Sequence, residues 1–101
     1  MFGLEKLFGP KTDYKALLKN GAVIVDVRSA AEFNSGHIKG ARNISVELVQ
    51  SRIKELLQLK KPIITCCASG VRSGMAARIL KSAGIEAYNG GSWGGLQSKI
   101  S

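Results

Sequence analysis

The chain is poor in the residue patterns that mark membrane proteins and metalloproteins. No apolar stretch in the 101 residues is long enough to cross a membrane, so we expect no membrane partner. The only histidine is His37, and the only cysteines are the adjacent Cys66 and Cys67, which do not have the spacing of metal ligands. The sequence therefore predicts neither a membrane-spanning protein nor a metal site.

Disulfides are also unexpected. The Cα atoms of adjacent residues lie about 3.8 Å apart, which is shorter than the roughly 4.4–6.8 Å of an ordinary disulfide. A bridge between Cys66 and Cys67 would be strained, so free thiols in a reducing compartment are the simpler interpretation. The N-terminus lacks a secretory pattern, because Glu5 and Lys6 interrupt it early. We therefore expect a cytoplasmic protein.

Acidic residues are scarce. The chain has 15 Lys and Arg against 7 Asp and Glu, which gives a net charge of +8. Such a charge attracts anions, but the basic residues are scattered and no run is longer than Lys60-Lys61. There is also no series of aromatic residues on which bases could stack. We expect solvated basic faces that attract small anions, and no nucleic-acid partner.

What the chain does contain is an alternation of strand and helix patterns. Short apolar runs predict strands at 22–27, 41–44, 63–66 and 85–88. Helices are predicted after the capping residues Asp13, Ser29 and Ser45, and over 73–82. The glycines at 90, 91, 94 and 95 predict a loop that enters a weak terminal helix. This alternation favours an α/β fold, a small parallel sheet of four or five strands with helices on both faces.

The segment 66–74 holds the main candidate site. Its order places a thiol at the carboxyl end of a strand and just before a helix N-terminus. Free backbone N–H groups and the helix dipole stabilise negative charge there, so we expect the pKa of the thiol to be lowered. Arg72 adds a permanent charge and a planar fork of donors. Such a loop suits a reaction that forms or transfers an anionic group on sulfur.

Residues 67–73 resemble the active-site loop of the rhodanese family, Cys-x-x-Gly-x-Arg-Ser, with Cys67 as its cysteine. Three more segments resemble motifs of that family: Asp26-Val27-Arg28 with Glu32-Phe33, the stretch from Gly36 to Ile44 that includes His37, and Gly90-Gly91. The resemblance covers about residues 21–96 of a single domain over 1–101, and leaves residues 1–11 as an N-terminal arm. Lys39 and Trp93 depart from the family pattern, in positions that do not touch the thiol loop.

The resemblance implies a single-domain sulfurtransferase without a metal or organic cofactor. Cys67 would take the outer sulfur of a small anionic donor such as thiosulfate and hold it as a persulfide. It would then pass this sulfur to a thiophilic acceptor, which could be cyanide, a thiol or a sulfur-carrier protein. The implied substrate-binding loop is Ala68, Ser69, Gly70, Val71, Arg72 and Ser73, and the implied structural supports are Asp26, Arg28 and His37.

Several roles stay open at this level. Arg72 could bond the carbonyls of its own loop or bind substrate oxygens, and Ser73 is expected to cap the following helix. The short loop of small residues predicts an open site. Counted from Cys66, the spacing Cys-x5-Arg also matches the phosphate loop of cysteine phosphatases and arsenate reductases. A third alternative is a protein-binding module of the same fold without catalysis.

Overall fold

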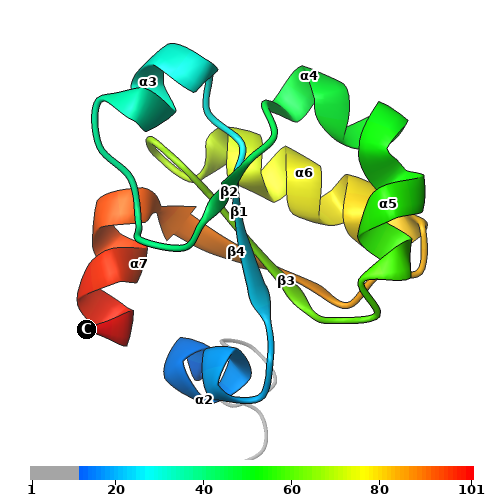
Figure 1. Cartoon of the computed structure of the whole chain (residues 1–101), viewed down its shortest axis with the longest axis horizontal. Helices are drawn as coiled ribbons and strands as arrows, with labels where there is room; N and C mark the ends of the chain where they lie inside the picture. Colours follow the sequence, from blue (N-terminus) through cyan, green and yellow to red (C-terminus); the bar gives the residue numbers. More distant parts are fainter. Residues whose placement is uncertain (1–11) are drawn as a thin grey trace, which may run out of the picture.

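The computed structural model describes residues 12–101, which form a four-stranded sheet with helices around it (Figure 1). The order along the sheet is β2-β1-β3-β4, and all three pairings are parallel. The strands are β1 (Val23–Asp26), β2 (Arg42–Asn43), β3 (Ile63–Cys67) and β4 (Ala87–Ser92). The predicted α/β fold is confirmed, whereas the predicted N-terminal arm, 1–11, lies outside the described residues.

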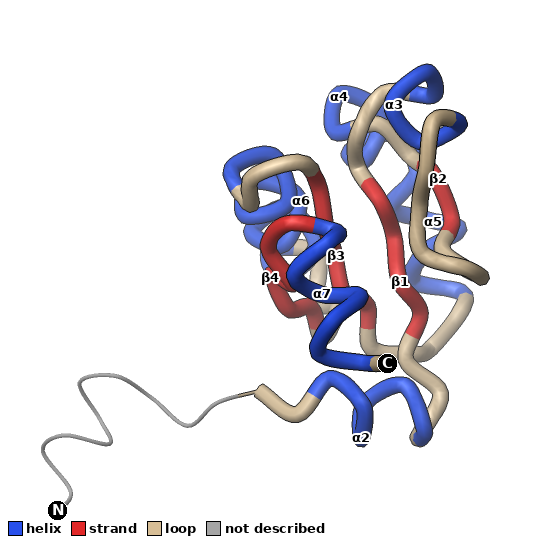
Figure 2. Tube along the Cα trace, turned by 90° about the vertical axis from the view of Figure 1, so that its left-hand side faces the viewer, coloured by secondary structure: helices blue, strands red, loops and turns tan. Residues whose placement is uncertain are grey.

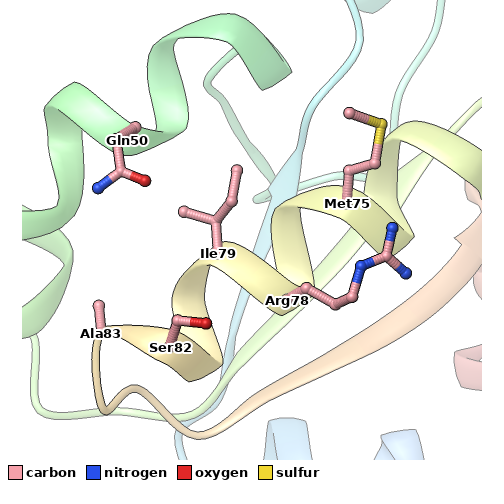
Figure 3. A pocket seen from close by; sticks show the side chains of 6 residues that line it. All are labelled: Gln50, Met75, Arg78, Ile79, Ser82 and Ala83. Atoms are coloured by element: carbon pink, nitrogen blue, oxygen red, sulfur yellow. The ribbon is translucent and has the colours of Figure 1, made fainter.

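Helices cover both faces of this sheet (Figures 1 and 2). One face carries α4, α5 and α6, and the other carries α2 and α7. The helices are α2 (Tyr14–Lys19), α3 (Ala30–Asn34), α4 (Val46–Val49), α5 (Ile53–Gln58), α6 (Val71–Ser82) and α7 (Trp93–Ile100), with a 3-10 helix, η1 (Gln50–Arg52), between α4 and α5. Figure 3 shows a groove between η1 and α6, lined by Gln50, Met75, Arg78, Ile79, Ser82 and Ala83.

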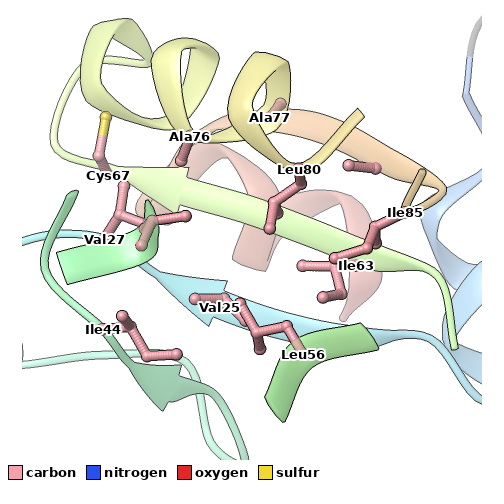
Figure 4. Close-up of a cluster of buried hydrophobic side chains, with 12 residues drawn as sticks. Val25, Val27, Ile44, Leu56, Ile63, Cys67, Ala76, Ala77, Leu80 and Ile85 are labelled. Carbon is pink, nitrogen blue, oxygen red and sulfur yellow. The ribbon is translucent and has the colours of Figure 1, made fainter. Parts of the chain in front are cut away.

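Two apolar clusters hold the layers together, and the two central strands, β1 and β3, contribute to both of them. On β1, Val25 packs under α4–α6 while its neighbour Ile24 packs under α2 and α7. Such alternation follows from the period of two along a strand. Figure 4 shows the first cluster, in which Leu56 of α5 and Leu80 of α6 meet Ile63 of β3. The branched apolar runs therefore form strands because both of their faces are buried.

The structure corrects the single long helix predicted after Ser45. That segment is broken into α4, η1 and α5, and the Ser45 side chain makes no capping hydrogen bond. The Ser51 hydroxyl donates to the Leu48 carbonyl oxygen over 2.8 Å. A serine that bonds back to the preceding turn competes with the helical backbone and bends it, which accounts for the tightened turn.

The structure also corrects the predicted loop at Gly90-Gly91, because both glycines lie in β4. A Cβ atom on Gly90 would lie only 2.7 Å from the Thr65 carbonyl oxygen of β3. Glycine is therefore needed there for the two backbones to approach each other. The last strand begins at Ala87 and not at Ile85, since its extent is set by pairing with β3.

Candidate active site

The predicted thiol lies where the two central strands end. Cys67 is the last residue of β3 and Asp26 is the last residue of β1, and these strands are neighbours. The chain runs from β1 outward to β2 and from β3 outward to β4 in the opposite direction. In open parallel sheets, ligands bind outside the carboxyl ends of the strands at the point where the connections diverge. The topology therefore places Cys67 at the ligand-binding edge.

The loop between β3 and α6 wraps its backbone around the Cys67 sulfur. The Gly70 N–H donates to Sγ over 3.0 Å, and the Ser73 N–H donates over 3.4 Å. The Ser73 hydroxyl oxygen lies 3.3 Å from the same sulfur. Gly70 has φ +99°, a left-handed conformation that glycine adopts without strain and that turns its amide inward. The loop therefore offers several donors to one sulfur atom.

These contacts act on the ionisation of the thiol. Burial raises the pKa of Cys67, but the contact with the Ser73 hydroxyl and the hydrogen bonds from the amides of Ser73, Gly70 and Ser69 lower it by more. The net pKa of the thiol lies below that of an ordinary cysteine, because each of these bonds favours the charged form.

The predicted open site is wrong, since Cys67 is 0% exposed. The small side chains of the loop do not leave the thiol uncovered, because the backbone itself folds over it. Ala68, Ser69 and Val71 are exposed, although they belong to the loop that encloses the sulfur. These three residues contribute to the site through their backbone, which covers the thiol.

The adjacent thiol has the opposite character. Cys66 lies on the other face of the sheet, packed with Ile24, Ile64 and Leu96. Burial, and then the negative charge of Asp26, raise the pKa of Cys66 to about 12. Such an environment is that of an inert, buried thiol. The phosphate loop counted from Cys66 is wrong, because its nucleophile would face away from the loop that holds Arg72.

Arg72 has a partner that the sequence interpretation missed. Its Nη1 and Nη2 atoms lie 2.7 and 3.0 Å from the two carboxylate oxygens of Glu32, so the pair is bidentate. Of the two roles left open for Arg72, bonds to its own loop carbonyls are not seen in the described residues, where its guanidinium bonds Glu32 instead. The Arg72 guanidinium, and then the Ser29 amide, lower the pKa of Glu32 to about 2. The capping box that Glu32 forms with Ser29 was visible in the sequence, but its distant partner was not.

Asp26 and Arg28 form a buried ion pair with Nη2 and Oδ2 2.7 Å apart. Arg28 also donates to the Gly36 carbonyl oxygen over 2.7 Å, and its guanidinium lies 4.8 Å from the centre of the Trp93 ring. These contacts tie the end of β1 to the segment after α3 and to the start of α7. Their geometry is that of structural support beside the thiol loop.

His37 lies at the surface, at the end of the segment that follows α3. Its Nδ1 atom is 2.8 Å from the Phe33 carbonyl oxygen, and its ring stacks on Phe33 with centroids 3.7 Å apart. Both contacts are local to this segment. The geometry agrees with the structural role that the resemblance implies for His37.

Ser73 does not cap α6, because the helix begins at Val71 with Gly70 as its N-cap residue. Ser73 is buried, and its hydroxyl donates to Oδ1 of Asn89 over 2.7 Å. Asn89 was not among the predicted site residues. The only signal was its place just before Gly90-Gly91, since its contact with Ser73 spans 16 residues.

Among residues 12–101, no three acidic, histidine or cysteine side chains gather as metal ligands could. No helix in this part of the chain has the length and apolar character needed to cross a membrane.

Comparison with known proteins agrees with the fold described above. A family profile described as Rhodanese-like domain matches residues 11–94. The uncharacterized protein YqhL of Bacillus subtilis (strain 168) is 44% identical over 79 residues, which are 73% of this chain and 62% of that protein. The tRNA uridine(34) hydroxylase of Bacillus cereus (strain Q1) is 37% identical over 73 residues, which are 66% of this chain but only 23% of the hydroxylase. The chain therefore spans less than two thirds of either relative.

A solved structure described as a rhodanese with anions from E. coli has the same fold. It superimposes with a TM-score of 0.69 at 28% sequence identity, over 74% of this chain and 91% of that one.

Proposed function

Because the chain belongs to the rhodanese-like family, we propose that it is a sulfurtransferase that carries sulfur on Cys67. The observation that supports this most directly is the geometry around Sγ, which receives the N–H groups of Gly70 and Ser73 at 3.0 and 3.4 Å. Donors arranged in this way stabilise an anion on one sulfur atom. A thiolate before the reaction and a persulfide after it are both such anions.

The proposed reaction has two displacements. In the first, the Cys67 thiolate attacks the outer sulfur of thiosulfate, a new S–S bond forms, and sulfite leaves with the electron pair of the old one. In the second, cyanide attacks the outer sulfur of the persulfide and leaves as thiocyanate, which restores the thiolate. Charge balances in each step, so no redox partner is needed. A covalent intermediate of this kind predicts ping-pong kinetics.

Access to the buried thiol is part of the proposal. Since Cys67 has no exposed surface, the donor reaches it when the loop over the sulfur opens. In a cell the acceptor would be a thiol or a sulfur-carrier protein, in a reducing compartment where Cys67 stays free. Hydroxylation is not proposed, because the chain corresponds to 23% of the hydroxylase that it resembles.

The test is intact-protein mass spectrometry after treatment with thiosulfate. We expect the protein to gain one sulfur atom, mapped to Cys67, and to lose it when cyanide is added. Cys66→Ser is the matched control and should retain the gain, whereas Cys67→Ser should abolish both the gain and thiocyanate formation. Sulfur found on Cys66, or no sulfur on the wild-type protein, would contradict the proposal, and the second result would favour a non-catalytic binding module.

A further inference from the structure

Asn89 of β4 bonds two residues of the thiol loop, Gly70 and Ser73, and Gly91 of its own strand through one carboxamide. Its Oδ1 atom accepts from the Ser73 hydroxyl over 2.7 Å and from the Gly91 N–H over 3.0 Å. Its Nδ2 atom donates to the Gly70 carbonyl oxygen over 3.1 Å. The Gly91 N–H can only donate, so the carboxamide oxygen must face it, and this fixes the orientation of the amide. Both lone pairs of Oδ1 are then in use.

The helix opposite Asn89 leaves room for this amide. Gly74 lies inside α6, where glycine is unfavourable relative to alanine. A Cβ atom on Gly74 would lie 3.1 Å from Nδ2 of Asn89, which is tighter than an ordinary contact. The backbone of Asn89 is held as well, because the Tyr14 hydroxyl donates to its carbonyl oxygen over 3.0 Å. The position of the Asn89 side chain therefore explains why a glycine occupies position 74 of α6.

We propose that Asn89 is a positioning residue for the reactive thiol, acting through Gly70 and Ser73. It does not touch the sulfur. It holds the carbonyl of Gly70 and so restrains the backbone of the residue whose N–H donates to Sγ over 3.0 Å, and it anchors Ser73, the other loop residue that contacts Sγ. This deepens the proposed function, because it rests on Cys67 being the reactive thiol.

The physical consequence concerns the anion on sulfur. Without the Asn89 carboxamide, the Gly70 carbonyl keeps only the Gly74 N–H of α6 as a partner, and the loop gains freedom to rotate. A less well aimed Gly70 N–H stabilises the thiolate less, so the thiol should ionise at higher pH. The Ser73 hydroxyl acts in the opposite sense, because once released from Asn89 it is free to donate to the thiolate. The two effects shift the pKa of the thiol in opposite directions, so the direction of the measured shift shows which of them is larger.

The test measures the rate of iodoacetamide alkylation against pH in the full chain carrying Cys66→Ser, which leaves one thiol. Asn89→Ala should raise the midpoint of this profile by about one pH unit, the size expected when a hydrogen bond to the charged form weakens. Asn43→Ala is the matched control. The Asn43 amide bonds two backbone carbonyls, those of Asp26 and Arg28, and contacts no atom of the thiol loop. The Asn43→Ala variant should leave the midpoint of the alkylation profile unchanged even if its melting temperature falls.

A second variant keeps Asn89 in place. Gly74→Ala should favour the helix but push the carboxamide aside, and we expect a smaller rise of the midpoint in the same direction. An unchanged midpoint in both Asn89→Ala and Gly74→Ala, or a lowered one, would overturn the inference. A lowered value would mean that Asn89 chiefly withholds the Ser73 hydroxyl from the thiolate. Because alkylation needs no sulfur donor, a raised midpoint in a protein that takes up no sulfur would support the inference and contradict the proposed function.

Discussion

At the scale of single residues, the two neighbouring cysteines show how environment sets reactivity. Cys66 is buried among apolar side chains beside the charge of Asp26, which raises the pKa of its thiol to about 12. Cys67 is equally buried, yet the hydrogen bonds within its loop outweigh burial and lower its pKa. The difference comes from which face of β3 each side chain occupies. Position on the strand therefore separates an inert thiol from an acidic one.

This contrast gives a prediction for alkylation by iodoacetamide. In the Cys66→Ser protein, we expect the rate to follow one titration with a midpoint below about 8.5, the ordinary value for cysteine. In the Cys67→Ser protein, the remaining thiol should stay unreactive near neutral pH. Rates measured under the same conditions on both variants check this. A midpoint at or above the ordinary value in the first variant would show that the loop does not stabilise the thiolate.

The Arg72–Glu32 pair predicts a pH dependence of stability. The pKa of Glu32 is about 2 in the folded protein and 4.5 for an unperturbed group, so the folded state binds the proton less readily. The stabilisation is therefore fully present above about pH 4.5 and is lost as the pH falls toward about 2.

We expect the melting temperature of Glu32→Gln to lie below that of the wild type at neutral pH, and the difference to shrink as the pH falls through this window. Glu47→Gln, which changes an exposed glutamate of α4, is the control and should show little difference at either pH. A difference between wild type and Glu32→Gln that is independent of pH would argue against the ion pair as its source.

At the scale of elements, two glycines that look alike in the sequence do opposite things. Gly90 lies in β4 against the Thr65 carbonyl of β3, whereas Gly94 lies in the first turn of α7 with nothing within 4 Å of an added Cβ. Gly90→Ala should lower the free energy of unfolding by about 2 kcal/mol through overpacking. Gly94→Ala should raise it by about 0.5 kcal/mol, because alanine favours a helix. Denaturant titration of both variants measures this, and equal effects would contradict it.

The same elements show how far the sequence could predict the structure. The central strands and the capping box of α3 were predictable, because branched apolar runs and the Ser29–Glu32 spacing are local signals. The extent of β4 was not, since its glycines have low strand propensity and pair only because β3 lies beside them. The partners of Arg72 and Ser73 were also missed. Glu32 is 40 residues from Arg72 and Asn89 is 16 from Ser73, so only the folded sheet brings them together.

At the scale of the whole molecule, the site depends on bringing β1 and β3 side by side. The Asp26–Arg28 pair closes the end of β1, and Arg72 links the start of α6 to Glu32 of α3. The Arg72–Glu32 pair therefore joins the segments that follow β1 and β3, near the edge where Cys67 lies. The thiol loop is thus held from α3 through Glu32 and from β4 through Asn89, and neither contact would exist in an isolated β3–α6 unit.

The positive charge of the whole chain should act on the same edge at longer range. A net charge of +8 attracts anionic reagents toward the surface, and salt screens this attraction, with a Debye length of about 30 Å at 0.01 M and about 3 Å at 1 M. Iodoacetate and iodoacetamide react with a thiolate by the same displacement, but only iodoacetate is an anion. For the Cys66→Ser protein, we expect the iodoacetate rate divided by the iodoacetamide rate to fall several-fold as sodium chloride is raised between these limits. The iodoacetamide rate serves as the internal control, since effects of salt on the loop or on the thiol pKa alter both rates alike. A ratio that does not change with salt would show that the charge of the chain has no influence at Cys67.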